Sequence, residues 1–143
     1  MIAALAFFWL AAAAPVAAAG DSVTVYKSPT CGCCKLWVDH LRDAGFDVEV
    51  RDKGDVTPHK QRLGVPPRLA SCHTAVVDGY VIEGHVPAED VRRLLATRPD
   101  VVGLAVPGMP MGSPGMEFGA PEPYDVIAFG RDGSTRVFAS HGR

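Results

Sequence analysis

Three cysteines lie within four residues of one another, in the sequence C-G-C-C at positions 31–34, and a fourth follows at position 72. Cys31 and Cys34 have the C-x-x-C spacing that is typical of redox and metal sites. A short strand-forming run, residues 23–26, precedes them and a helical pattern follows. The motif is therefore expected at the N-terminus of a helix, where the dipole stabilises a thiolate and lowers the pKa of a cysteine. Such a sulfur is both a nucleophile and a metal ligand.

The extra cysteine, Cys33, separates several kinds of chemistry. A thiol–disulfide exchanger needs one cysteine to attack and one to resolve, and a third thiol permits wrong pairings. Tetrahedral zinc fits poorly, because adjacent residues rarely direct both side chains to one ion and zinc sites favour C-x₂₋₄-C pairs. Three thiolates at one turn suit several soft ions that share bridging sulfurs, and copper(I) is the soft ion that thiolates select. We therefore predict a copper(I) site that contains Cys31, Cys33 and Cys34.

Three methionines lie close together in a second segment that can do soft-metal chemistry. Residues 107–117 have the sequence P-G-M-P-M-G-S-P-G-M-E and contain Met109, Met111 and Met116. Thioethers are soft, neutral ligands, so these side chains are weaker candidates for receiving or passing on copper(I). The alternative is that they are flexible packing residues of a loop that covers the cysteine site. We favour the covering loop for most of them.

The elements that must position the cysteines form a β-α-β pattern. Residues 23–26 predict a strand, residues 35–44 a helix with one apolar face, and residues 46–51 a second, half-buried strand. Gly45 suits the left-handed position that ends a helix. The cysteines then lie at the turn between the first strand and the helix.

Further elements follow along the chain. Thr57 and Pro58 are expected to begin a short helix, as N-cap and first helical residue, which ends at Gly64. Residues 72–77 and 80–83 predict two strands joined by an Asp78-Gly79 hairpin turn, and residues 87–96 predict another helix. Residues 101–123 form a long stretch rich in Gly, Pro and Met without predicted structure, and residues 126–129 and 135–138 predict a closing hairpin. The core order β-α-β-α-β-β-α predicts an α/β domain of thioredoxin-like arrangement.

In such an arrangement Cys72, at the start of the third strand, lies opposite the C-x-x-C turn and is the candidate fourth ligand. A buried structural thiol is the alternative, since free cysteine packs like a small apolar residue. The polar neighbours Ser71, His73 and Thr74 are not a core pattern and favour the functional role. His73 is expected to point to the opposite face of an extended strand, so metal ligation and a surface role both stay open.

The other histidines have weaker claims on a site. His40 is expected at the rim of the first helix, and His59, His85 and His141 are expected at the surface, because none has a partner at metal-ligand spacing. The sequence contains no evident Ser/His/Asp triad, phosphate-binding glycine loop or pair of catalytic carboxylates.

Length, charge and the N-terminal residues bound the classes of protein. A chain of 143 residues with net charge −2 has room for one domain, and it lacks the basic surplus of a nucleic-acid binder. Residues 1–19 are almost wholly apolar and end in an A-x-A pattern, which predicts a signal peptide followed by one domain, residues 20–143. The run lacks a basic residue at its start, and a membrane anchor is the alternative. We expect export to a bacterial periplasm and no membrane association after cleavage.

The chain contains three motifs in one order: C-G-C-C at 31–34, S-C-H-T at 71–74 and V-P-G-M-P-M-G-S-P-G-M-E at 106–117. With them the chain resembles the periplasmic metal-binding family, long classed as a domain of unknown function, that includes the copper resistance protein CopG. The resemblance spans residues 23–138. It implies a thioredoxin-like fold, copper binding by Cys31, Cys33, Cys34 and Cys72, and a part in copper or silver tolerance that includes redox handling of copper.

Two functions therefore compete. The first is an exported protein that holds copper(I), in one or several ions, and exchanges it with periplasmic copper-handling proteins. The second is a thiol–disulfide oxidoreductase that uses Cys31 and Cys34, or a redox enzyme that acts on copper itself. Thr30 stands before Cys31, where thioredoxins usually carry tryptophan. The cis-proline that thioredoxins carry just before the third strand is displaced here, because Pro67 lies five residues before Cys72. Both features count against thiol exchange. An iron–sulfur or zinc site is a third option that the C-x-C-C spacing disfavours. Whether the protein is an enzyme stays open at this point.

Overall fold

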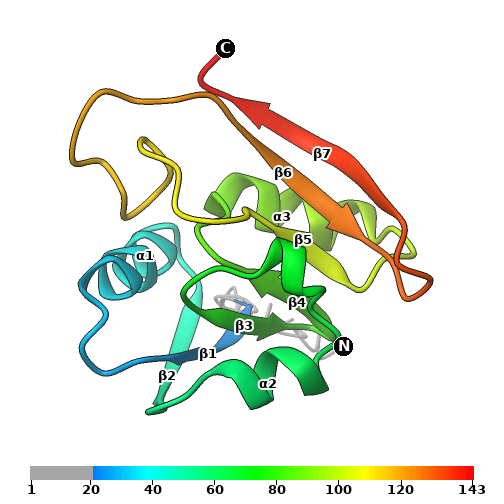
Figure 1. Ribbon diagram of the computed structural model, residues 1–143, viewed down its shortest axis with the longest axis horizontal. Coiled ribbons are helices and arrows are strands. Elements are labelled where there is room, and N and C mark those ends of the chain that lie inside the picture. Colours follow the sequence, from blue (N-terminus) through cyan, green and yellow to red (C-terminus); the bar gives the residue numbers. More distant parts are fainter. Residues whose placement is uncertain (1–20) are drawn as a thin grey trace, which may run out of the picture.

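The computed structural model describes residues 21–143, which form a mixed α/β fold around one seven-stranded sheet (Figure 1). Neighbouring strands follow the order β2-β1-β3-β4-β5-β6-β7, with parallel pairing for β1/β2 and β4/β5 and antiparallel pairing elsewhere. The elements are β1 (Ser22–Lys27), α1 (Gly32–Asp43), β2 (Asp47–Asp52), α2 (Thr57–Arg62), the 3₁₀ turn η1 (Pro67–Leu69), β3 (Thr74–Val77), β4 (Tyr80–Glu83), α3 (Ala88–Thr97), β5 (Gly103–Ala105), β6 (Tyr124–Phe129) and β7 (Thr135–His141). The predicted signal peptide, residues 1–19, lies outside the described residues.

The α/β prediction is confirmed, and so is the order of elements through α3, apart from the added turn η1. The thioredoxin-like assignment stays a prediction from that order. β1, α1 and β2 form the expected β-α-β unit, and Gly45, with φ +94°, follows α1 in the left-handed conformation. The helix begins three residues earlier than predicted, at Gly32, so that Cys33 and Cys34 belong to its first turn.

Two details of the prediction are wrong. Thr57 is not the N-cap of α2: that position is Val56, and the carboxylate of Asp55 accepts the Thr57 N–H instead. Within the stretch predicted to be without structure, residues 103–105 form β5, which pairs with β4 and β6 inside the sheet. Gly103 allows this pairing, because a Cβ there would lie 1.8 Å from the Val81 carbonyl oxygen.

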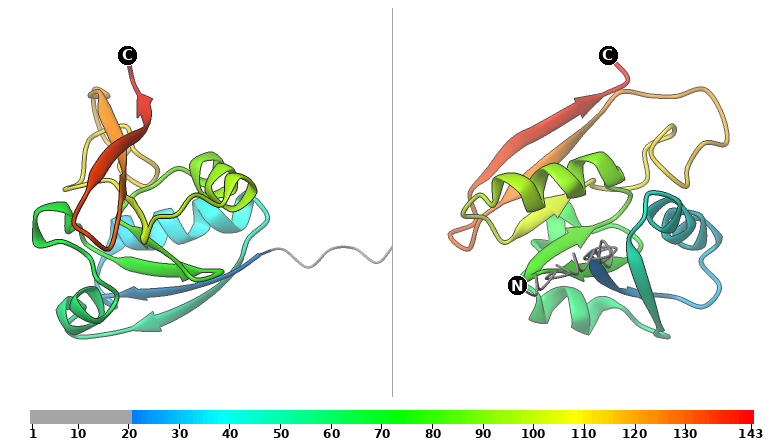
Figure 2. Two further views of the ribbon diagram at one scale, coloured as in Figure 1. Left: turned by 90° about the vertical axis from the view of Figure 1, so that its right-hand side faces the viewer. Right: turned by 180° about the vertical axis from the view of Figure 1, so that it is seen from behind.

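The apolar residues form two clusters, one on each face of the sheet. α1 and α3 cover the same face, as Figure 2 shows, and bury Trp37, Leu41 and Leu94 against strand residues that include Val25 and Ile82. The segment after α2 covers the other face in a smaller cluster of Val65, Leu69, Val81, Ala105 and Phe129. These clusters fix the first turn of α1 relative to the ends of β3 and β4.

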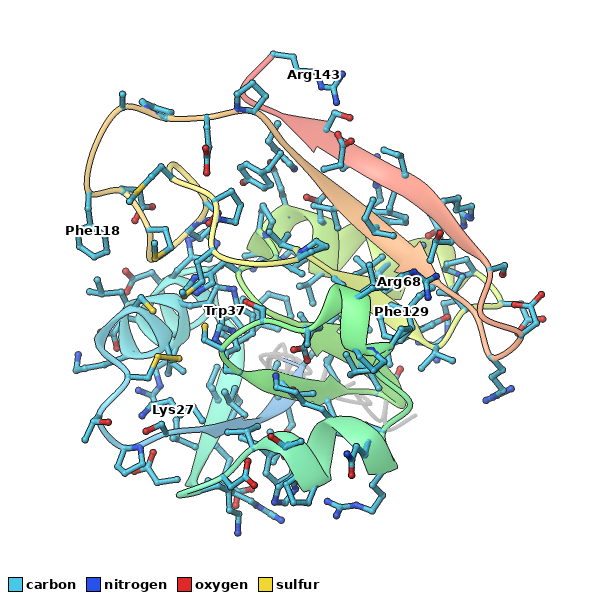
Figure 3. The ribbon with its side chains drawn as sticks, in the orientation of Figure 1. Lys27, Trp37, Arg68, Phe118, Phe129 and Arg143 are labelled. Carbon is cyan, nitrogen blue, oxygen red and sulfur yellow. A yellow bond between two sulfur atoms is a disulfide. The ribbon has the colours of Figure 1, made fainter. Side chains whose placement is uncertain are left out.

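Residues 106–123 connect β5 to β6 and lie over the N-terminal half of α1 (Figure 1). Residues 107–117, called here the covering segment, include buried Pro114, Gly115 and Met116. The exposed Phe118 follows on the outer side of the loop (Figure 3). This segment forms part of the surroundings of the cysteines.

Candidate metal centre

The C-G-C-C turn places three sulfur atoms at the start of α1. Cys31 is the N-cap residue, and its Sγ accepts the backbone N–H of Cys34 at 3.3 Å. Cys31 and Cys34 form a disulfide, whereas Cys33 is a free thiol whose Sγ lies 3.5 Å from that of Cys31. Cys34 is buried and the other two are partly exposed. A partly exposed sulfur is therefore paired with a buried one.

Cys72 completes the group from a distant part of the chain. The sulfur atoms of Cys31, Cys33, Cys34 and Cys72 all lie within 4.8 Å of one another. The four residues that the sequence singled out are thus brought together, with Cys33 and Cys72 as free thiols. Four sulfurs at this separation can hold a metal ion when they are reduced.

A buried ion pair holds the segment that carries Cys72. Glu83, at the end of β4, is fully buried, and its Oε1 accepts hydrogen bonds from Lys60 Nζ at 2.5 Å and from the Ser71 N–H at 2.7 Å. Its Oε2 accepts the Thr74 hydroxyl at 2.6 Å. Burial raises the pKa of Glu83, and the Lys60 ammonium opposes that rise. Ser71, the residue before Cys72, is fixed by this network.

Gly84 lets the Cys72 segment pack closely on the sheet. Its φ is +73°, and a Cβ there would lie 2.6 Å from the Ser71 Cβ and 2.7 Å from the Val106 carbonyl oxygen. The Gly84 N–H donates to the His73 carbonyl at 3.0 Å, which continues the β3–β4 pairing beyond the strands. A side chain at this position would displace the segment from the cysteine turn.

The structure corrects the prediction for His73. Cys72 and His73 lie before β3 begins at Thr74, so strand alternation does not separate their side chains. The Nδ1 of His73 lies 3.3 Å from the Cys72 Sγ, and its ring packs against that of Trp37 with centroids 4.3 Å apart and the planes tilted by 36°. Burial lowers the pKa of His73 well below its ordinary value. His73 is thus a buried neutral ring beside the thiol.

His85 was predicted at the surface, and this is wrong. Its side chain is fully buried, and its Nε2 lies 3.1 Å from the Cys72 Sγ. Cys72, His73 and His85 each offer one ligand atom, and these three atoms lie within 4.8 Å of one another. The cause is the hairpin, in which Thr74 pairs with Glu83 and the residues beyond them continue toward each other. The two-residue Asp78-Gly79 turn carried the signal that could have found His85.

The remaining histidines lie elsewhere. His40 accepts the Ala88 N–H at the start of α3, and His59 stacks on Tyr26. His141 was expected to lack partners, but its Nε2 lies 2.7 Å from Asp90 and its Nδ1 3.7 Å from Glu89. These acidic partners come from α3, in which Asp90 lies 51 residues earlier in the chain, so the spacing of residues near His141 could not indicate them.

Trp37 connects α1, which carries the cysteines, to the residues that follow β4. Its Nε1–H donates to the Val86 carbonyl at 2.9 Å in a buried hydrogen bond, next to His85. Figure 3 shows the Trp37 side chain between α1 and the ends of the central strands. The bond fixes the distance between α1 and the residues that follow β4.

The covering segment closes over the first turn of α1. Gly115, with φ +89°, comes so close that a Cβ there would lie 2.7 Å from the Cys33 carbonyl oxygen and 3.0 Å from the Trp37 nitrogen. Of the three methionines, Met116 is buried, whereas Met109 and Met111 are 49% and 37% exposed. Met116 therefore packs within the fold, and the other two thioethers face solvent.

Comparison with known proteins adds to this geometry. Two solved structures, of copper resistance protein CopG in Form 2 and Form 1, match with a TM-score of 0.82 and 46% sequence identity. The matches cover 86% and 87% of this chain and 99% of each CopG chain. The chain belongs to the CopG family. A family model described as "Protein of unknown function, DUF411" matches residues 69–116, and the curated proteins gave no match.

The part of this CopG-family chain that the DUF411 model matches contains Cys72, His73, His85 and residues 107–116 of the covering segment, but it begins after the C-G-C-C turn. Burial raises the pKa of Cys72 to about 11, and the nearby Cys33 adds to the rise. At neutral pH Cys72 is therefore a thiol, and a metal ion that binds its sulfur displaces a proton. The centre has the donor set of a soft-metal site.

Proposed function

We propose that this CopG-family protein holds copper(I) in a thiolate site formed by Cys31, Cys33, Cys34 and Cys72, and serves copper tolerance or the redox handling of copper. The observation that carries the proposal is the approach of all four sulfur atoms to within 4.8 Å of one another. Thiolates select copper(I) over harder ions, and sulfurs this close can bridge several ions. A multinuclear copper(I) cluster is the arrangement that these donors favour.

Copper loading depends on the redox state of Cys31 and Cys34. Their disulfide leaves two free thiols, on Cys33 and Cys72. A dithiol reductant supplies two electrons and two protons, becomes a disulfide itself, converts the Cys31–Cys34 disulfide into two thiols and so doubles the number of sulfur ligands. The reduced chain is therefore the form that takes up copper(I).

Other side chains extend the proposed site. His73 contributes a neutral nitrogen beside Cys72. The exposed thioethers of Met109 and Met111 are suited to transfer copper between the site and a periplasmic copper-handling protein, while buried Met116 supports the covering segment. Thioethers remain available in an oxidising compartment, where free thiols are not.

The proposed location is the bacterial periplasm, with residues 1–19 as the signal peptide and residues 20–143 as the mature domain. Within residues 21–143, every helix is too short or too polar to cross a lipid bilayer. The net charge of −2 gives no electrostatic basis for nucleic-acid binding. Fractionation of a host that expresses the chain, with N-terminal sequencing of the product, tests cleavage before Gly20.

The decisive experiment measures copper per chain beside free thiols. The chain from Gly20 is purified under anaerobic, reducing conditions and loaded with copper(I). We expect more than one tightly bound copper ion per chain and protection of all four thiols from alkylation. Absence of tight copper, with two thiols that cycle readily to a disulfide, would contradict the proposal.

The Cys31–Cys34 disulfide favours thiol–disulfide exchange as the second candidate function. The partly exposed Cys31 is placed to attack a substrate disulfide and form a mixed disulfide, and the buried Cys34 then displaces the substrate as a dithiol. The protein pair is oxidised as the substrate is reduced. In this case Cys33→Ser retains disulfide reductase activity and Cys31→Ser loses it; equal activity of the two variants excludes the mechanism.

A further inference from the structure

His85 is held in one orientation and one tautomer. Its Nδ1 lies 2.8 Å from the backbone carbonyl oxygen of Pro114, in the covering segment, and both groups are buried. A carbonyl oxygen only accepts hydrogen bonds, so Nδ1 carries the proton and donates it. In the neutral ring the lone pair then resides on Nε2. Burial lowers the pKa of His85 and so favours the neutral ring.

The lone pair of His85 Nε2 faces the sulfur site. Nε2 lies 3.1 Å from the Sγ of Cys72. In a tetrahedral site with metal–sulfur and metal–nitrogen bonds of about 2.3 and 2.0 Å, a sulfur and a nitrogen ligand lie about 3.5 Å apart. A movement of about half an ångström therefore lets one ion bind both atoms. Without metal, the Cys72 S–H donates a hydrogen bond to this nitrogen.

The surroundings match those of metal-ligating histidines. Such a histidine usually donates its second ring N–H to a carboxylate or backbone carbonyl, which fixes the tautomer. The Pro114 carbonyl supplies this partner. The neighbouring His73 also directs a nitrogen to Cys72, and its Nε2 is buried without a hydrogen-bond partner within residues 21–143. Nitrogen donors therefore surround one side of the fourth sulfur.

We propose that His85 Nε2 is a metal ligand that shares a copper ion with Cys72, and that the covering segment positions it through the Pro114 carbonyl. The inference rests on the proposed function for the identity of the metal. It gives the glycine-proline-methionine motif a role: Gly115 permits the close approach to α1, and Pro114 then orients the imidazole. When the ion binds, the Cys72 thiol releases its proton to solvent and the ion takes its place beside Nε2.

Nitrogen NMR of the unaltered protein tests the geometry directly, because copper(I) is diamagnetic. With ¹⁵N-labelled histidine and reduced, metal-free protein, we expect His85 to have a protonated Nδ1 and an unprotonated Nε2. On addition of copper(I) the Nε2 resonance shifts strongly, while Nδ1 keeps its proton. A protonated Nε2, or an Nε2 resonance that copper(I) leaves unchanged while the thiols become protected, would overturn the inference.

A pair of histidine variants tests the ligand by substitution. In His85→Gln we expect a smaller imidazole contribution to the copper X-ray absorption spectrum and at least tenfold weaker copper(I) binding against a competing chelator. His59→Gln is the matched control on α2, where the ring stacks on Tyr26, and it keeps both properties. Unchanged spectra and affinity in His85→Gln would contradict the proposal.

The outcomes separate this inference from the proposed function. If the wild-type chain binds no copper(I), the proposed function fails first. If it binds copper(I) through sulfur alone, the function stands and the assignment of His85 is wrong. Should His85→Gln fail to fold, as judged by circular dichroism, the NMR experiment on the wild-type protein still decides.

Discussion

The two sides of the candidate centre are built in different ways. Cys31, Cys33 and Cys34 come from one turn of four residues, and two of these sulfurs are partly exposed. Cys72, His73 and His85 come from the two arms of the β3–β4 hairpin. The first side, the cysteine turn, rests on local helix geometry, while the second, the histidine side, rests on long-range packing.

This difference separates a side that contains a disulfide from a side that buried contacts hold rigid. The cysteine turn can change covalent state, since Cys31 and Cys34 form a disulfide within it. The histidine side is held by the buried Glu83–Lys60 pair, the Trp37 hydrogen bond to Val86 and the Pro114 carbonyl. In the proposed function, sulfurs that change between disulfide and thiol on one side, next to fixed ligand atoms on the other, would suit a site that takes up copper in the reduced state.

The largest effect is expected from breaking the histidine side at Glu83. Glu83→Gln removes a buried charge and leaves the largely buried Lys60 ammonium without its partner, which costs about 3–5 kcal/mol of unfolding free energy. Urea denaturation of the metal-free protein measures the loss. The exposed Lys35–Asp39 pair on α1 gives the control, and Asp39→Asn is expected to change stability little. Equal losses of unfolding free energy would show that the buried Glu83–Lys60 pair stabilises the fold no more than an exposed pair does.

A substitution at Gly115 tests the contact between the covering segment and α1. Alanine at Gly115 and at Gly108 adopts a left-handed conformation, at φ +89° and +68°, but only at Gly115 does the new Cβ meet the α1 backbone. We therefore expect Gly115→Ala to lose about 1–3 kcal/mol more stability than Gly108→Ala, because the site is overpacked. Thermal and urea unfolding of the two variants compare them. If both variants lose the same amount of stability, the covering segment can move away from α1 without strain.

The cysteine turn and most of the fold could be predicted from the sequence because they depend on contacts between residues close together in the chain. The C-x-x-C spacing, the apolar face of α1 and the Asp78-Gly79 turn all act within a few residues. β5 was missed because its three residues, Gly-Leu-Ala at 103–105, are too few to show the alternation of a strand. Its structure comes from pairing with β4 and β6.

The histidine side escaped prediction because alternation was applied beyond the strand. His73 was assigned to the opposite face, although β3 begins only at Thr74. His85 was judged by its chain neighbours alone. The hairpin register, with Val77 opposite Tyr80 and Thr74 opposite Glu83, places Cys72 opposite His85 when it is continued. That inference needed only the turn type, whereas the Pro114 contact needed the fold of the covering segment.

A smaller and more selective effect is expected at Cys33. Cys33→Ser removes one sulfur from the cysteine turn but leaves the Cys31–Cys34 pair able to form its disulfide. We expect lower copper content per reduced chain and unchanged stability of the oxidised chain, since the side chain is partly exposed. Metal analysis and urea denaturation measure the two. Unchanged copper content would remove Cys33 from the proposed site and make the cysteine turn a simple redox pair.

The smallest effect is a change in pH dependence that distinguishes Cys72 from the cysteine turn. Because the pKa of Cys72 is raised to about 11, its sulfur carries a proton throughout the range from pH 6 to 8. Protons compete with copper(I) for this sulfur, so raising the pH strengthens binding, by about tenfold per unit for each proton displaced. In Cys72→Ser the slope of log affinity against pH is expected to fall by about one. Competition with a chelator of known proton affinity measures the slopes. Equal slopes in the two proteins would mean that copper does not displace the Cys72 proton, and Cys72 would then not be a ligand.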